Sequence, residues 1–403
     1  MHLADRRETI SDRSLTFLLA AITAIAPLVM QMYLPALPSI GEDLGSSAKA
    51  TQLTFSAFVF AVGAAQLVYG PLSDHFGRRN TAIASMVVCL VGSVGCAIAP
   101  SIGWLVFARI IQAIGSAGGM VISRAILSDR YGHSGMAARL SSVIVVIVVV
   151  PMLAPLIGGY LTAWQGWRSV FLASAAFILA VLIVASVKLP ETRVKAAHRE
   201  RLAEGAAALF KQPLFVGYTL QSALSLAVFY TFIAVVPYVM ENTLNLPPTA
   251  YGQYFITLAM GYMLGTLVSS KTASSLGIVR MVQIGTAIGF TASMALFAGV
   301  FMATLAPWVM FGPMMFLAAA NGFASPSMQS GAVLQSEHYA GTASGIVGCA
   351  QQLLAGVTVQ IVALWGLNSP GPMAVAIIVA TSVTIVCTLM LPRMNRQVDH
   401  SPS

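Results

Sequence analysis

Long apolar stretches follow one another along the whole chain, separated by short polar segments. A helix that spans the hydrocarbon core of a bilayer needs about 20 predominantly apolar residues. Twelve stretches meet this requirement: 15–37, 51–71, 80–100, 103–126, 139–162, 167–188, 214–240, 250–270, 281–303, 307–329, 341–365 and 372–391. They are continuous rather than alternating over about 10 residues, which excludes a transmembrane β-barrel. The pattern predicts an all-α membrane protein with twelve transmembrane helices.

The charge-dense segment 189–213 divides these stretches into six and six. We therefore expect an N-terminal six-helix bundle over residues 1–188, a cytoplasmic linker loop over 189–213 and a C-terminal six-helix bundle over 214–403. A short amphipathic helix in the linker would lie along the membrane surface.

Composition leads to the same class of protein. The 403 residues are 57% hydrophobic and 8% charged, whereas soluble domains carry about 25% charged residues. The charges are also distributed unevenly. If both termini lie on one side of the membrane, seventeen of the 21 basic residues fall on that side: Arg6, Arg7, Arg13, Arg78, Arg79, Arg130, Arg139, Lys188, Arg193, Lys195, Arg199, Arg201, Lys211, Lys271, Arg280, Arg393 and Arg396.

The positive-inside rule makes that side the cytoplasm. Only Lys49 and Arg168 fall on the other side, while Arg109 and Arg124 lie within the fourth stretch. We expect a multi-pass protein of a bacterial inner membrane with both termini in the cytoplasm. Topology and attraction to anionic lipid explain the basic loops, so no nucleic-acid partner is required.

Cysteine and histidine show no pattern typical of chemistry. All four cysteines lie inside apolar stretches, and all six histidines lie in tails or loops. Neither residue type has the spacing of a metal site or a catalytic cluster. We therefore expect no enzyme activity, no metal and no cofactor.

The loop after the second stretch reads Gly70-Pro-Leu-Ser-Asp74-His-Phe-Gly77-Arg78-Arg79. Its glycines allow two helices to turn tightly and approach closely. Asp74 can accept hydrogen bonds from a neighbouring helix N-terminus or pair with an arginine. The string resembles the G-x-L-a-D-x-x-G-R-R signature of the major facilitator superfamily. Residues 265–280 contain a weak echo of it, as two parallel six-helix halves would predict.

Further strings resemble motifs of this superfamily. They are Arg109-Ile-Ile-Gln112-Ala-Ile-Gly115, Pro151-Met-Leu-Ala-Pro155-Leu-Ile-Gly158-Gly159, Gly166-Trp167-Arg168 with Phe171, and Leu189-Pro190-Glu191-Thr192. The second is similar to the antiporter motif of drug exporters, with Ala154 where glycine is usual. The string 32–38, Met-Tyr-Leu-Pro-Ala-Leu-Pro, resembles the bicyclomycin-resistance (Bcr/CflA) branch of drug:H+ antiporters. The resemblance implies a monomer that exports small amphiphilic drugs or metabolites by alternating access, with the proton gradient as its energy source.

One position departs from that branch. An aspartate usually precedes the Met-Tyr-Leu-Pro string, and here the residue is Gln31. An embedded carboxylate can take up and release a proton, whereas glutamine cannot titrate. None of the 13 acidic residues lies near the middle of a stretch. If transport is coupled to protons, Asp74 or Asp129 has to titrate, or the substrate itself carries the proton.

Arg109 is the candidate for a positive charge inside the substrate cavity. A buried cation costs several kcal/mol unless it is compensated. Two interpretations stay open. Arg109 either binds an anionic or strongly hydrogen-bonding substrate, or it bonds to backbone carbonyls or Gln31 and braces the first helix against the fourth. For Arg124 and Asp129, we favour a gate or loop anchor over substrate contact.

The candidate site residues come from helices that line the cavity in this superfamily. Candidate substrate-binding residues are Gln31, Tyr33, Phe58, Arg109, Gln112, Met152, Gln221, Tyr230, Tyr254, Asn321, Gln351 and Gln352. Candidate gating or coupling residues are Asp74, Arg78, Arg124, Asp129, Pro151, Pro155, Gly158 and Gly159. Unpaired amides are costly in hydrocarbon, which favours a function for the glutamines and Asn321. Interhelical hydrogen bonding and packing remain the alternative.

Two functions follow. The first is proton-coupled export of amphiphilic compounds. The second is export or facilitated passage of an anionic metabolite through Arg109, without an embedded proton-coupling carboxylate. A channel is disfavoured because the sequence has no charged ring or filter-like repeat.

Overall fold

The computed structural model describes residues 11–192, 202–335 and 340–399; the side chains of 131–149, 151–152, 202–203, 340 and 392–399 lie outside that description. Every regular element in these ranges is helical. The N-terminal half contains α1 (Asp12–Gln31), η1 (Leu34–Ala36), α2 (Leu37–Asp43), α3 (Ala48–Phe76), α4 (Arg78–Ala97), α5 (Ile102–Gln165) and α6 (Arg168–Lys188). The rest contains α7 (Leu202–Phe210), α8 (Pro213–Tyr238), η2 (Val239–Thr243), α9 (Pro248–Met302), α10 (Pro307–Val333), α11 (Ala340–Trp365) and α12 (Gly371–Asp399).

Ten helical segments are long and apolar enough to cross a membrane. One of them, α9, has 55 residues and would measure about 83 Å if straight, far more than the roughly 30 Å of bilayer hydrocarbon. It turns back at Gly277, whose φ of 72° and ψ of 164° are non-helical, and so contributes two spans. The second part of α5 contains the fifth predicted stretch, 139–162. The predicted all-α fold with twelve transmembrane helices is confirmed.

The first predicted span is not one continuous helix. Instead of a single helix over 15–37, α1 ends at Gln31, and a 3₁₀ turn and α2 follow. Pro35 and Pro38 cause this break, because proline has no N–H to donate to the preceding turn. Tyr33 therefore stands at the junction between two helical segments, where its side chain is wholly buried.

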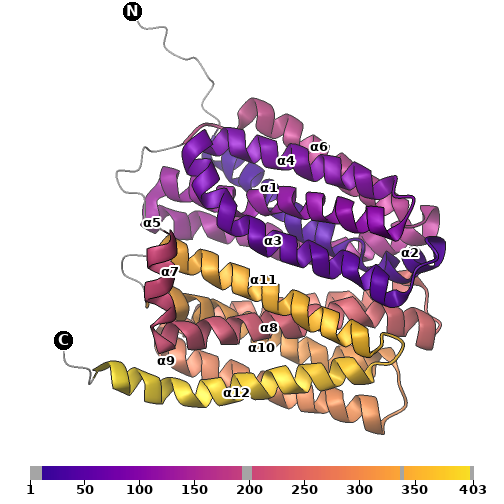
Figure 1. The fold of residues 1–403 in the computed structure, drawn as a ribbon. Helices are drawn as coiled ribbons and strands as arrows, with labels where there is room; N and C mark the ends of the chain where they lie inside the picture. Colours follow the sequence, from indigo (N-terminus) through magenta and orange to yellow (C-terminus); the bar gives the residue numbers. More distant parts are fainter. Residues whose placement is uncertain (1–10, 193–201, 336–339, 400–403) are drawn as a thin grey trace, which may run out of the picture.

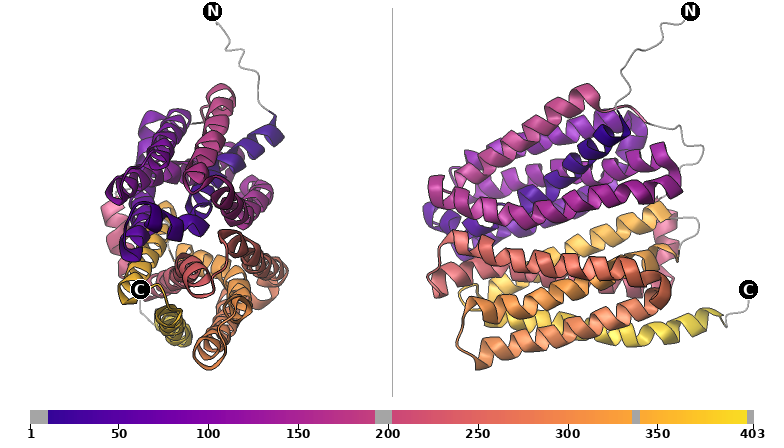
Figure 2. Two further views of the ribbon diagram at one scale, coloured as in Figure 1. Left: turned by 90° about the vertical axis from the view of Figure 1, so that its right-hand side faces the viewer. Right: turned by 180° about the vertical axis from the view of Figure 1, so that it is seen from behind.

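The helices form two bundles that lie side by side (Figures 1 and 2). In the first, α5 packs against α1, α3 and α4; in the second, α9 packs against α10 and α12, and α8 against α11. The bundles meet where α3 contacts α11 and where α5 contacts α9. The start of α1 and the end of α12 lie at the same end of the molecule as α7 (Figure 1). We call this the terminal end, and the other the opposite end.

The buried apolar residues form two clusters, and their positions show where the bundles join. The larger core contains residues of both bundles, and its members from the C-terminal bundle lie toward the opposite end, such as Val235, Val236 and Phe311. The smaller core belongs to the C-terminal bundle and α7 and lies toward the terminal end, around Phe215 and Met328. The halves therefore share a continuous core toward the opposite end.

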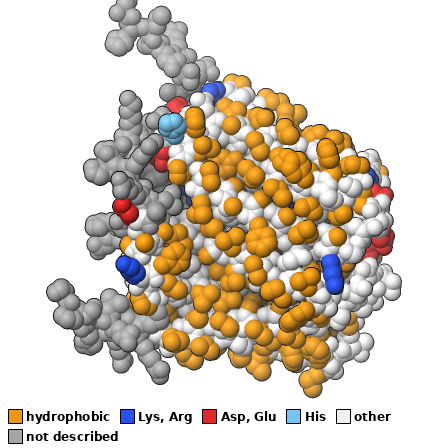
Figure 3. Space-filling view, viewed as in Figure 1, with side chains coloured by type: hydrophobic (Ala, Val, Ile, Leu, Met, Phe, Trp, Pro, Cys, Tyr) orange, Lys and Arg blue, Asp and Glu red, His pale blue; other side chains and the backbone are white. Residues whose placement is uncertain are grey.

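Apolar side chains also cover the outside. In the face shown in Figure 3, hydrophobic residues extend over the bundle between its two ends, and the charged side chains lie mainly toward those ends. Exposed residues on this kind of surface include Phe107, Trp164, Val187 and Leu389. Such a surface suits contact with lipid rather than water.

Glycines permit a very close approach of α4 and α5. A Cβ atom built on Gly115 would lie 2.2 Å from the backbone nitrogen of Cys89, and one built on Gly92 would lie 2.3 Å from the backbone nitrogen of Gln112. Both distances are far below van der Waals contact, so only glycine fits. This contact determines the position of Gln112, and of Arg109 one turn away.

We expect Gly115→Ala to lower the stability of the protein by about 1–3 kcal/mol, the usual range for overpacking a tight core. The measurement is the thermal unfolding midpoint of the purified protein in detergent. Gly312→Ala is the matched control, because no atom lies within 4 Å of the Cβ that it adds. A Gly115→Ala midpoint equal to that of Gly312→Ala would contradict the close packing.

Candidate functional site

Arg109 lies within α5 with its side chain completely buried (0% exposed). Its guanidinium carbon Cζ lies 4.0 Å from the ring centre of Tyr33 and 4.0 Å from that of Phe58. Phe171 is a third aromatic neighbour, at 5.9 Å. The negative face of an aromatic ring attracts a cation, more strongly when water is excluded. Aromatic residues of α3, of α6 and of the junction after α1 therefore hold the charge of α5.

Hydrogen bonds determine the orientation of the guanidinium. Nη1 donates to the backbone oxygen of Val29 at 3.0 Å and to Oε1 of Gln112 at 2.5 Å. Gln112 is held in turn, because its Nε2 donates to Oγ of Ser93 at 2.8 Å. Arg109 thus connects α1 with α5 through a backbone carbonyl, which is the geometry expected of a brace. In the described part of the chain it makes no hydrogen bond to Gln31.

The same site contains polar atoms that lack a hydrogen-bond partner among the described residues. They are Nε and Nη2 of Arg109, Oε1 of Gln31 and, on the neighbouring helix α3, both amide atoms of Gln52, and all are buried. Each unsatisfied buried group costs about 1–3 kcal/mol, and more when it is charged. The brace therefore satisfies only one of the three nitrogens of Arg109, and the others are available to a ligand or to water.

Among the described residues, no carboxylate lies in contact with this guanidinium. Asp12 and Asp43, two acids of the N-terminal half, are instead paired at its two ends. Asp43 accepts from Arg168 at 2.6 Å and from Trp167 at 3.0 Å at the opposite end. Asp12 pairs with Arg130 at 3.2 Å at the terminal end. The sequence prediction that acidic residues avoid the span centres agrees with these positions.

The candidates from the C-terminal half do not gather around Arg109. Tyr230 comes nearest, because its ring packs edge-on against Phe55 of α3 with centroids 5.7 Å apart. Gln351 donates to Ser222 at 2.6 Å, and Tyr254 packs on Phe311. Both contacts are within the C-terminal bundle.

Three further candidates of that half lie apart from one another. Asn321 lines a separate cavity of about 30 Å³ between α8, α9, α10 and α12. Gln221 is completely buried, with neither amide atom bonded to a described residue. Gln352 lies against Gly63 of α3. The side chains of Met152 and Pro151 lie outside the described residues.

The analysis of the sequence missed three residues of this environment: Gln52, Ser93 and Tyr238. Tyr238 is buried, and its hydroxyl group lies near Thr51 and near enough to Tyr33 for an electrostatic interaction. Gln52 could have been found by the argument that selected Gln112, since it is an amide at the edge of an apolar stretch. Ser93 carries no comparable signal, because serines are common within spans.

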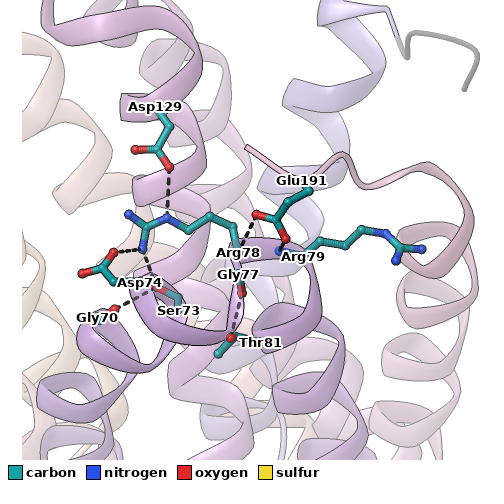
Figure 4. A network of polar contacts seen from close by, with 9 residues as sticks. All are labelled: Gly70, Ser73, Asp74, Gly77, Arg78, Arg79, Thr81, Asp129 and Glu191. Atoms are coloured by element: carbon teal, nitrogen blue, oxygen red, sulfur yellow. Dashed lines mark hydrogen bonds and ion pairs between the residues drawn. The ribbon is translucent and has the colours of Figure 1, made fainter. Parts of the chain in front are cut away.

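Arg78 organises a second polar site, at the terminal end (Figure 4). Its guanidinium lies 2.6 Å from Oδ1 of Asp74 and 2.9 Å from Oδ2 of Asp129, and it donates to Oγ of Ser73 at 2.5 Å. These contacts connect α3, α4 and α5 at one point. Asp74 therefore pairs with an arginine, one of the two partners that its sequence position suggested.

The contact of a carboxylate with a helix N-terminus, which the sequence offered as a role for Asp74, is made by Glu191 instead. Its Oε1 accepts from the backbone N–H of Arg78 at 2.8 Å and its Oε2 from that of Arg79 at 3.2 Å. The preceding residue, Gly77, has a φ of 95°, and a Cβ there would lie 2.5 Å from Glu191. Glycine is therefore required both by the backbone conformation and by the space that Glu191 occupies.

Arg124 and Asp129 do not form a pair with each other. Asp129 anchors the loop through Arg78, as described above. Arg124 lies one to two turns away with an exposed side chain, and the described residues provide it with no hydrogen bond or ion pair.

The antiporter-like string forms a close contact at the opposite end. A Cβ on Gly158 would lie 1.7 Å from the backbone oxygen of Met32, and one on Gly159 would lie 2.7 Å from that of Pro248. On the facing helix, a Cβ on Gly252 would lie 2.8 Å from the backbone oxygen of Pro155. The backbones of α5, α9 and the break after α1 therefore close this end of the molecule.

We expect Glu191→Ala to destabilise the protein by about 0.5–2 kcal/mol, because the first turn of α4 loses its only side-chain cap among the described residues. Glu191→Gln keeps one acceptor oxygen, so its unfolding midpoint should lie between those of the wild type and Glu191→Ala. Thermal unfolding in detergent measures both, with Glu42→Gln, an exposed acid at the opposite end, as control. Equal midpoints for Glu191→Ala and wild type would refute the capping role.

We expect Gly252→Ala to open the opposite end, because the added Cβ would lie 2.6 Å from Cα of Leu156. The measurement is the labelling rate of a cysteine placed at Thr249 in a cysteine-free background, using a membrane-impermeant maleimide. Labelling should accelerate by about tenfold for a shift of 1.4 kcal/mol. Gly312→Ala should leave the rate unchanged, and an unchanged rate in Gly252→Ala would contradict the closure.

Comparison with known proteins agrees with this architecture. The family model of the Major Facilitator Superfamily matches residues 19–359. The chain is 24% identical to a bicyclomycin resistance protein homolog of Haemophilus influenzae over 94% of this chain and 96% of that protein. It is 26% identical to multidrug resistance protein D of Escherichia coli K12 over 95% and 97% of the two chains.

A solved structure shows the same fold at low identity. The crystal structure of a D-xylose-proton symporter superposes with a TM-score of 0.73 at 17% identity, covering 93% of this chain and 96% of that one. The family match, the related resistance proteins and the two-bundle fold agree that this is a multi-pass membrane transporter and not an enzyme. The chain belongs to the Major Facilitator Superfamily.

Proposed function

We propose that the chain exports small amphiphilic drugs or metabolites by alternating access, in antiport with protons. The observation that carries the proposal is the buried site around Arg109, where aromatic rings and unsatisfied polar atoms lie together inside an apolar bundle. Such a site offers both apolar contact and hydrogen bonds to one ligand. The relatives named as multidrug and bicyclomycin resistance proteins support export of drug-like compounds.

Alternating access requires each end to open in turn. The close contacts of Gly158, Gly159 and Gly252 support a closed state of the opposite end. The Arg78 network would then be a contact that forms and breaks at the terminal end. Its two carboxylates, on Asp74 and Asp129, are the protein's candidates for the coupled proton, because Gln31 cannot titrate.

The location and partners follow from the same reasoning. We propose a bacterial inner membrane, with the terminal end in the cytoplasm because the basic residues gather there. The protein would act as a monomer in contact with membrane lipid, with a small-molecule substrate and no cofactor. The proton gradient would be its energy source.

A second candidate function has its own support. Arg109 is a buried cation with no carboxylate in contact among the described residues, and the aspartate of the related branch is replaced by Gln31. An exporter or facilitator of an anionic metabolite would use this charge directly. It would need no embedded proton-coupling carboxylate.

Transport into liposomes of defined pH separates the two candidates. We expect a proton gradient to accelerate ethidium transport by the wild-type protein, and Asp129→Asn or Asp74→Asn to remove that acceleration, because one of these acids carries the proton. Asp43→Asn, at the opposite end, is the matched control and should keep the acceleration. Ethidium transport that is indifferent to the gradient would contradict proton antiport, and gradient-independent transport of an organic anion in the same liposomes would favour the anion carrier.

A further inference from the structure

We infer that the site around Arg109 binds the carboxylate group of an amphiphilic organic acid, side-on, through Nε and Nη2 of the guanidinium. The inference rests on the proposed transport function and names the chemical class of substrate that this site selects.

The guanidinium of Arg109 has N–H donors that no described residue accepts from. A guanidinium has five N–H groups in a fixed plane. Both N–H groups of Nη1 have acceptors, which are the Val29 oxygen and Oε1 of Gln112. The N–H groups of Nε and Nη2 have none among the described residues. These two nitrogens share one edge of the guanidinium, and two parallel N–H groups on one edge match the two oxygens of a carboxylate.

The aromatic rings beside the guanidinium also limit where a ligand can contact it. Cζ lies 4.0 Å from the ring centres of both Tyr33 and Phe58. Rings at this distance take up space beside the guanidinium and limit the directions from which a ligand can reach it. The bonds of Nη1 stop the group from rotating. The geometry therefore favours a planar, two-oxygen acceptor over a single oxygen atom.

The positive charge of Arg109 also favours an anionic ligand. The described residues place no acid against Arg109, so a ligand carboxylate would be the first opposite charge in contact with it. A cationic ligand would gain no such pairing with Arg109. Tyr33 adds a buried hydroxyl group beside Arg109 and Thr54, which can donate to a carboxylate oxygen as well.

The aromatic residues around Arg109 suit the apolar part of an organic acid. Phe58 and Phe171 surround the guanidinium, and the edge-on pair of Phe55 and Tyr230 brings both bundles together nearby along α3. An aryl or alkyl tail can pack on these rings. Arg109 has no exposed surface in this conformation, so the acid would enter when the halves separate.

The experiment compares three ligands with one shared tail: 4-phenylbutyrate, its primary amide and 4-phenylbutylamine. Thermal stabilisation of the purified full-length protein gives an apparent Kd for each. We expect the carboxylate to bind at least about tenfold more tightly than the amide, and the amine to bind least. Arg109→Lys keeps the charge but has no fork of two N–H groups, and should weaken carboxylate binding about tenfold. Arg168→Lys, at the opposite end, should leave it unchanged.

Two results would overturn the inference: amide or amine binding as tight as carboxylate binding by the wild type, or unchanged carboxylate affinity in Arg109→Lys. The wild-type series decides the matter even if Arg109→Lys does not fold. Ethidium transport by wild-type liposomes is measured in parallel. Transport of ethidium without selective carboxylate binding would reject this substrate class while leaving the proposed efflux function intact.

Discussion

The placement of one buried positive charge constrains much of the N-terminal half. Arg109 lies between two aromatic rings and is bonded to a backbone carbonyl of α1 and to Gln112 of its own helix. The contact with Gln112 depends on the close approach of α4, which glycine makes possible. The aromatic contact depends on the break after α1, which brings Tyr33 against the guanidinium. A change at any of these positions would move the guanidinium or remove a contact that stabilises its charge.

Different kinds of interaction hold the helices together at the two ends of the molecule. The opposite end is closed by backbone packing on glycine, which is short-ranged and sensitive to single atoms. The terminal end is held by ion pairs and a capped helix around Arg78 and Glu191, which water and protons can reach. An alternating-access cycle needs contacts that can be exchanged, and the difference suggests that ligand binding and protonation act on different ends.

Sequence reasoning predicted the fold well, because span length and apolar continuity are properties of the chain alone. It also selected Arg109, Gln112, Tyr33 and Phe58, since a polar or aromatic side chain inside a span is conspicuous. It did not predict that Glu191, 113 residues after Arg78, would cap α4. Such a contact depends on where two loops meet in space. The same is true of Asn321, which faces a separate cavity and not Arg109.

Among the described residues no acid contacts Arg109, so the edge of the guanidinium formed by Nε and Nη2 is the part that would bind the oxygens of a ligand. Calorimetry of 4-phenylbutyrate binding, performed at one pH in buffers of different ionisation enthalpy, tests this most directly by counting the protons exchanged on binding. Near neutral pH, where ligand and arginine are both charged, we predict binding without net proton exchange. Uptake of close to one proton per ligand would reveal an acid that shares the site with Arg109, and would contradict the account.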